Sequence, residues 1–138
     1  MSERQRVLFL CTGNSARSQM AEGLLRSIAG DRFEVFSAGT IRSFVRPQAI
    51  AVMNELGIDI SHHQSKSVDE FVGAHFDYVI TVCDHANQHC PHFPGQTKRI
   101  RWSIDDPVGA GSDAAELVAF RRARDELQER IRTFIAEN

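Results

Sequence analysis

The chain has 138 residues, with 16 basic and 18 acidic side chains and a formal net charge of −2. This length suffices for one well-buried core, and no Pro-, Gly- or Ser-rich linker divides it, so we expect a single domain over 1–138. The near balance of charge, without a basic run, argues against a nucleic-acid partner. No apolar stretch approaches the ~20 residues of a membrane span, and the first residues lack the apolar region of a signal peptide, so we expect a cytoplasmic protein.

Apolar runs in the sequence predict four short buried strands with helical segments between them. The predicted strands are 7–10, 33–36, 78–82 and 100–104. The helical patterns cover 18–29, 47–57, 67–72 and the residues from Asp113 onward. In the last helix, the residues expected to face the core are Leu117, Phe120, Leu127, Ile131 and Phe134. This alternation predicts an α/β fold with a parallel sheet covered by helices on both faces.

The first predicted strand leads into a loop with the features of an oxyanion site. Its residues are Cys11, Thr12, Gly13, Asn14, Ser15, Ala16, Arg17 and Ser18. In the order strand, loop and helix, the loop amides converge on one point, to which the helix adds the positive end of its dipole. This field favours the thiolate form of Cys11, a nucleophile, and the Arg17 guanidinium fits two anion oxygens. Gly13 and Asn14 tolerate left-handed backbone, and Ser18 can bond the thiolate or cap the helix. The alternative is a buried cysteine followed by a surface arginine.

A second segment with cysteines follows the third predicted strand. It reads Cys83-Asp84-His85-Ala86-Asn87-Gln88-His89-Cys90. If the segment is helical, the rise between its two cysteines is ~10.5 Å, which is too far for a disulfide. Bonding Cys83 to Cys90 therefore requires unwinding, as in a conformational switch. With strand order 2-1-3-4, strands one and three are neighbours, so Cys11 and Cys83 can also reach disulfide distance.

An acidic turn, Asp105-Asp106-Pro107, follows the fourth predicted strand. Sites in open parallel sheets form beyond the carboxyl ends of the strands, so this turn is expected beside the oxyanion loop. In that position Asp106 is the expected general acid for a departing oxygen. Ordinary turn chemistry of an Asp before a Pro is the alternative.

Together these residues resemble the thioredoxin-coupled arsenate reductases, which share the low-molecular-weight protein tyrosine phosphatase fold. The resemblance covers nearly the whole chain and rests on residues 11–22, 37–39, 83–90, 102 and 105–107. It implies one domain with a four-stranded parallel sheet of order 2-1-3-4. Two departures disfavour a phosphatase: Ala16 stands where phosphatases of this fold have a second cysteine, and Val108-Gly109 stands where they have an aromatic pair.

The family mechanism, carried onto this chain, is a relay of three cysteines. The resemblance implies that Cys11 attacks arsenate held by the loop amides and Arg17, while Asp106 protonates the leaving oxygen. Cys83 then attacks Cys11, so that arsenite leaves and a Cys11–Cys83 disulfide remains. Cys90 next attacks Cys83, and thioredoxin reduces the Cys83–Cys90 disulfide. We therefore expect arsenate and thioredoxin as partners, no organic cofactor, no metal in the site, and a monomer.

Some relatives bind potassium beside the loop through equivalents of Asn14, Glu22 and Ser37 and through an acidic residue where this chain has Lys66. We expect the Lys66 ammonium to take the place of that ion by holding Glu22 and Asn14 directly, so that activity depends little on potassium. The alternative is an exposed loop charge.

Two other functions stay open at this point. One is a low-molecular-weight protein tyrosine phosphatase in which the second and third cysteines take no part. The other is a metal-binding or arsenical-binding protein that uses these cysteines with His85, His89 and His92. A buried Cys83 with an incidental Cys90 is the structural alternative to the relay.

Overall fold

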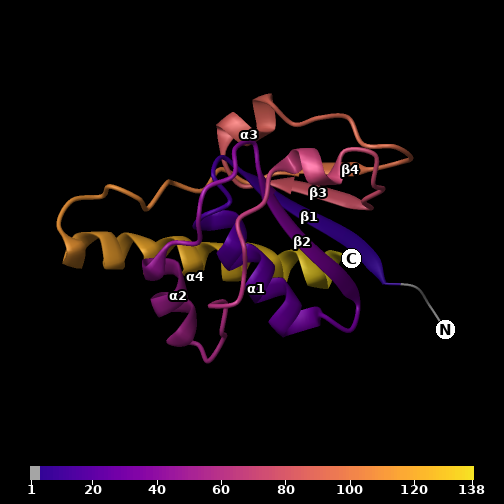
Figure 1. The fold of residues 1–138 in the computed structure, drawn as a ribbon. Helices are drawn as coiled ribbons and strands as arrows, with labels where there is room; N and C mark the ends of the chain where they lie inside the picture. The colour runs from indigo at the N-terminus through magenta and orange to yellow at the C-terminus, as the bar shows by residue number, and fades with distance from the viewer. Residues whose placement is uncertain (1–3) are drawn as a thin grey trace.

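The fold is taken from a computed structural model that describes residues 4–138. The prediction that no signal peptide is present concerns a segment whose first three residues, 1–3, lie outside the described residues. The strands of the fold are β1 (Gln5–Cys11), β2 (Phe33–Gly39), β3 (Tyr78–Thr81) and β4 (Lys98–Arg101). Its helices are α1 (Arg17–Ala29), α2 (Pro47–Asn54), the 3-10 helix η1 (Val68–Phe71), α3 (Asp84–Gln88) and α4 (Asp113–Glu137). Figure 1 shows how these elements surround one sheet.

The sheet is built around β1, whose last five residues are all buried. β1 pairs in parallel with β2 from Gln5↔Phe33 to Cys11↔Gly39 on one side. On its other side it pairs in parallel with β3, which in turn pairs with β4, so the strand order is β2-β1-β3-β4. The predicted parallel sheet and its order are confirmed, and the carboxyl ends of β1 and β3 lie side by side.

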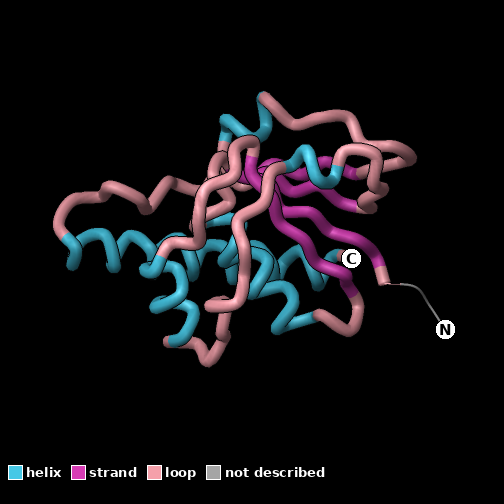
Figure 2. Tube along the Cα trace, viewed as in Figure 1, coloured by secondary structure: helices cyan, strands magenta, loops and turns pink. Residues whose placement is uncertain are grey.

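Alternating side chains of the strands face two different layers. On one face Phe33 packs against Phe134 of α4 and Phe9 packs against Trp102. Trp102 and Phe134 also contact each other, so the four rings form one aromatic cluster. On the other face Phe36 packs against Phe71 of η1. Figures 1 and 2 show α1, α2 and α4 together on the first side and η1 on the second. The expected cover on both faces is therefore confirmed, with the second face closed largely by η1 and loops.

Several elements differ in extent or type from those predicted, and β1 and β2 are each three residues longer. The predicted strand 100–104 is displaced, because β4 pairs along the four residues of β3 and ends at Arg101. The chain stays extended beyond it, since the N–H of Trp102 donates to the carbonyl of Thr81 at 2.7 Å. α2 ends at Asn54, and Gly57 (φ 74°) lies in the turn that follows. The segment predicted as a helix over 67–72 forms a 3-10 helix.

Helix α4 carries the core-facing positions expected of it. Phe120, Leu127, Ile131 and Phe134 are buried, and Leu117 is partly buried against the core. Arg124 is also buried, and its guanidinium donates to the carbonyl of Val52 at 2.7 Å, which ties α4 to α2. Within residues 4–138, none of the helices combines the length and apolar character needed to cross a membrane.

Candidate active site

The loop between β1 and α1 closes around the sulfur of Cys11, which is 2% exposed. The N–H of Asn14 points at this sulfur from 3.2 Å, and Ser18 Oγ lies 2.7 Å from it. A backbone N–H and a hydroxyl thus both lie within hydrogen-bond distance of one sulfur. Ser18 therefore contacts the thiol, and α1 begins without a side-chain cap.

Asn14 fixes the shape of the loop through its backbone and its side chain. It adopts left-handed backbone with φ 48°. Its amide nitrogen donates to Ser18 Oγ at 2.8 Å and to Ser37 Oγ at 2.9 Å, while its amide oxygen accepts from Gln19 Nε2 at 2.9 Å and from the N–H of Lys66 at 2.8 Å. Asn14, Ser18, Gln19 and Ser37 are fully buried. A buried polar network with all its bonds made holds the loop in one geometry before any anion binds.

Gly39, at the end of β2, lets the loop pack against the neighbouring strand. A Cβ on Gly39 would lie 2.6 Å from the carbonyl oxygen of Thr12 and 2.7 Å from the nitrogen of Asn14. Only a glycine fits at so close an approach of two backbones. Gly13, in contrast, is not among the residues with positive φ, so the left-handed backbone expected for both Gly13 and Asn14 occurs only at Asn14.

The structure brings Arg17 and Asp106 together at the mouth of the loop. One guanidinium nitrogen of Arg17 donates to the carbonyl of Ile104 at 2.9 Å, and another lies 3.7 Å from Asp106 Oδ2. The Arg17 side chain is nearly buried, whereas that of Asp106 is 56% exposed. The second carboxylate oxygen of Asp106 accepts from the N–H of Val108 at 3.0 Å. A guanidinium group and a carboxyl group thus share one edge of the loop.

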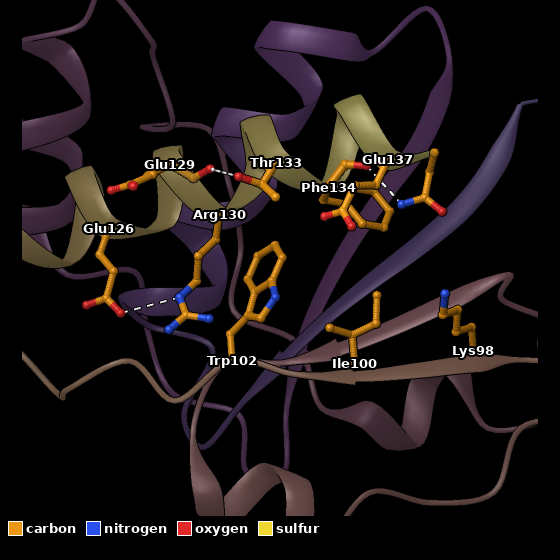
Figure 3. Close-up of a pocket in the computed structure, with 10 residues that line it drawn as sticks. Lys98, Ile100, Trp102, Glu126, Glu129, Arg130, Thr133, Phe134 and Glu137 are labelled. Carbon is orange, nitrogen blue, oxygen red and sulfur yellow. Dashed lines mark hydrogen bonds and ion pairs between the residues drawn. The ribbon is translucent and has the colours of Figure 1, made fainter.

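Two cavities border α4, and the loop of residues 11–18 lines neither of them. One, of about 660 Å³, lies between α4 and the turn that holds Asp106. The other, of about 600 Å³, lies between β4 and α4 over Trp102 and Phe134, beside the ion pair of Arg130 with Glu126 at 3.4 Å (Figure 3). The loop around Cys11 is therefore separate from both cavities.

Cys83 lies against the loop, and Cys90 lies beyond α3. Cys83 follows β3 and is 5% exposed, and its sulfur is 3.4 Å from Thr12 Oγ1. The same sulfur accepts from the N–H of Ala86 at 3.4 Å, as the N-cap of α3. Cys90 is half-buried, and burial raises the pKa of its thiol above the ordinary value. All three cysteines are free thiols, and the segment between Cys83 and Cys90 does contain a helix, α3.

The Lys66 ammonium makes one of its two predicted contacts: it pairs with Glu22 but not with Asn14. It donates to the carbonyl of Gln64 at 2.7 Å and is 4.0 Å from Glu22 Oε1. The prediction that this ammonium holds Asn14 is wrong, because the backbone N–H of Lys66 makes that bond. The cation nearest to Glu22 is instead Arg26, one turn along α1, at 2.6 Å.

Comparison with known proteins gives a consistent result. The profile of the family described as "Low molecular weight phosphotyrosine protein phosphatase" matches residues 6–137. This chain belongs to that family. The arsenate reductase of Halalkalibacterium halodurans is 46% identical to it over 129 residues, which cover 93% of each chain. A solved structure described as an arsenate reductase in the oxidized state has a TM-score of 0.84 and 35% identity, covering 96% of this chain and 98% of that one. The thioredoxin-dependent arsenate reductase of Corynebacterium glutamicum has a TM-score of 0.74 and 30% identity, covering 99% of this chain and 62% of that one.

Within this phosphatase-fold family, the chain places its predicted site residues on three neighbouring segments. The loop 11–18, Cys83 and Asp106 lie together at the carboxyl edge of the sheet, while Cys90 is separated from them by α3. The structural contributions of Gln19 and Ser37 to the loop went unrecognised at the sequence level, although both stand in stretches that carry the family resemblance. In the described residues 4–138, no group of three or more His, Cys, Asp or Glu side chains is arranged to hold a metal.

Proposed function

We propose that this chain reduces arsenate to arsenite with electrons from its three cysteines, and that thioredoxin restores the thiols. The observation that carries the proposal is the position of Cys83, whose sulfur lies 3.4 Å from Thr12 Oγ1, beside the loop that holds Cys11. Phosphate-ester hydrolysis requires no second thiol there, whereas a redox reaction does. The relatives described as arsenate reductases, one of them thioredoxin-dependent, support the same reaction.

In the first step Cys11 attacks arsenate. The loop amides and the Arg17 guanidinium bind the oxyanion, while the N–H of Asn14 and the hydroxyl of Ser18 stabilise the attacking thiolate. A sulfur–arsenic bond forms and one arsenic–oxygen bond breaks. Asp106, beside Arg17, gives its proton to the departing oxygen, which leaves as water.

In the second step Cys83 attacks the sulfur of Cys11. A disulfide forms between the two residues and the sulfur–arsenic bond breaks. Its electron pair stays on arsenic, which is reduced from arsenic(V) to arsenic(III) and leaves as arsenite. The two cysteines follow adjacent parallel strands, β1 and β3, so no change of fold is needed to bring them together.

The third step moves the disulfide toward the surface. Cys90 attacks Cys83, the Cys11 thiolate departs and a Cys83–Cys90 disulfide forms without net oxidation. Burial raises the pKa of the Cys90 thiol, so this cysteine becomes a better nucleophile once it reaches water. Because α3 separates the two residues, the step requires α3 to unwind. Thioredoxin then reduces the exposed disulfide. The proposal places this cycle in the reducing cytoplasm and has the chain act as a monomer.

The proposal is tested by arsenate-dependent oxidation of NADPH in the presence of thioredoxin and thioredoxin reductase. We expect turnover with the wild-type chain and its loss in Cys11→Ser, Cys83→Ser and Cys90→Ser. Full multiple turnover in Cys90→Ser would overturn the relay. If arsenate causes no NADPH oxidation while an aryl phosphate is hydrolysed equally well by wild type and Cys83→Ser, the chain is a phosphatase instead.

A further inference from the structure

Two histidines of the α3 segment take no part in the proposed relay: His85 lies in α3, and His89 is the residue that caps its C-terminus. His85 and His89 stand one helical turn apart, and the N–H of His89 donates to the carbonyl of His85 at 3.1 Å. Their rings lie side by side, with centroids 4.4 Å apart and an interplanar angle of 37°. Both side chains are exposed, so their ring nitrogens are open to solvent.

Two imidazoles at positions i and i+4 of a helix can bind one transition-metal ion from the same side. Imidazole nitrogen suits Ni²⁺, Cu²⁺ and Zn²⁺. We propose that His85 and His89 form a two-ligand site for a divalent transition metal, with water in the remaining positions, and that metal bound there stops the relay at the Cys90 step. This inhibitory site rests on the proposed function and adds a regulator to it.

Helix α3 is held in place by few bonds. It has only five residues, too short for a stable helix on its own. Asp84 pairs with Arg101 at 3.1 Å, and the carbonyl of Asn87 accepts from Arg99 at 3.4 Å. Ser103 Oγ also donates to Asp84 at 3.4 Å, and Thr81 Oγ1 donates to the side-chain oxygen of Asn87 at 3.4 Å. These contacts and the turn around Cys83 must break when α3 unwinds.

A metal on the histidine pair adds a restraint that unwinding destroys. In an extended chain, residues four apart lie ~13 Å from each other, too far for one ion to join their imidazoles. The metal therefore binds the helical form, and its binding free energy stabilises that form by mass action. While α3 stays helical, Cys90 is kept away from Cys83. Attack of Cys83 on Cys11 needs no unwinding, because Cys83 precedes the helix.

Binding is tested first, by calorimetric titration of the reduced full-length protein with Ni²⁺. We expect one site, with an affinity that falls roughly tenfold or more in His85→Gln and in His89→Gln, because each removes one of two ligands. His92→Gln is the matched control, a third histidine nearby that lies outside the pair, and it should bind Ni²⁺ as wild type does. Affinity that survives both pair substitutions, or that is lost in Cys90→Ser, would overturn the site.

Inhibition is tested in a single turnover with arsenate and no external reductant, followed by alkylation and disulfide mapping. Without metal we expect one arsenite per chain and a Cys83–Cys90 disulfide. With saturating Ni²⁺ we expect the same arsenite but a retained Cys11–Cys83 disulfide, whereas His85→Gln should form the Cys83–Cys90 bond in both conditions. A Cys83–Cys90 disulfide in Ni²⁺-bound wild type overturns the inhibition. Failure to form arsenite without metal would instead refute the proposed function, and the titration would still report on the site.

Discussion

The loop around Cys11 and the segment that ends at Cys90 are built in opposite ways. Behind Cys11 the side chains of Asn14, Ser18 and Gln19 are fully buried, and Asn14 alone makes four side-chain hydrogen bonds of 2.8 to 2.9 Å. In α3 the side chain of Asn87 accepts one bond of 3.4 Å, and the histidines stand in solvent. The difference teaches that the loop proposed to bind the oxyanion is held rigidly, whereas the segment proposed to carry the Cys90 thiol is held loosely.

The largest expected effect is the difference in arsenite formation between variants of Cys11 and Cys90, the cysteines at the two ends of the proposed relay. Cys11→Ser should lower the rate of arsenite formation by about 10³-fold or more, because the nucleophile is lost. Cys90→Ser should leave the first arsenite nearly unchanged and abolish later turnovers. Rapid-quench measurement of arsenite beside steady-state NADPH oxidation checks both. Equal loss of the first turnover in the two variants would contradict the claim that Cys90 acts only after arsenite has formed.

A smaller effect compares two asparagines, one in each region. Asn14→Ala should lower the free energy of unfolding by about 2–4 kcal/mol, because it leaves buried groups unpaired and places alanine in left-handed backbone. Asn87→Ala, which loses one long bond, should cost less than about 1 kcal/mol. Urea unfolding measures both losses, and Asn14→Gly separates the side-chain part from the backbone part. Similar costs at the two positions would contradict the contrast.

The close approach of β2 to the loop gives the next prediction. Gly39→Ala should cost about 1–3 kcal/mol of stability, since its Cβ would meet backbone atoms at 2.6 to 2.7 Å. It should also lower kcat/KM for arsenate, because the amides of the loop must shift. Gly13→Ala serves as the stability control, as its Cβ would make only ordinary contacts from 3.5 Å outward. A larger loss of stability at Gly13 than at Gly39 would contradict the packing described.

His63, in the buried network behind the loop, makes the free energy of unfolding depend on pH. Burial lowers its pKa below the ordinary 6.5, an effect partly opposed by the Glu22 carboxylate. The folded protein thus favours neutral His63, so this contribution to stability is full above pH 6.5 and is lost as the pH falls below it, by at most about 1.4 kcal/mol per pH unit. His63→Gln should flatten the decline in unfolding free energy between pH 6.5 and 5.5, whereas His62→Gln, next to it in the chain, should not. An unchanged slope in His63→Gln would remove this residue as the cause.

The smallest expected effect concerns potassium. Glu22 is already paired with Arg26 at 2.6 Å, and the Lys66 ammonium is 4.0 Å away, so added potassium finds little uncompensated charge. Turnover in potassium and in sodium buffers should differ by less than about twofold. Lys66→Asp should increase the response to potassium by replacing a cation with oxygen ligands. A gain of several-fold in the wild type would show that the neighbouring side chains do not substitute for the ion.

Local patterns in the sequence predict much of the fold around Cys11. The apolar run before Cys11 and the loop composition after it predicted the strand, the oxyanion loop and the helix. The limits appear where packing decides: the end of β4 depends on the length of β3, and the contact of Gly39 with Thr12 joins segments far apart in the chain. The contact of the Lys66 ammonium with Asn14 was predicted wrongly for the same reason, because the ammonium donates to the nearby carbonyl of Gln64, a detail of one loop conformation.

The most direct measurement is disulfide mapping after one turnover of the reduced protein with arsenate. We expect one arsenite per chain and a peptide linkage between Cys83 and Cys90, with Cys11 again free. Arsenite formed without any disulfide, or a linkage that leaves Cys83 as a free thiol, would contradict the three-cysteine relay.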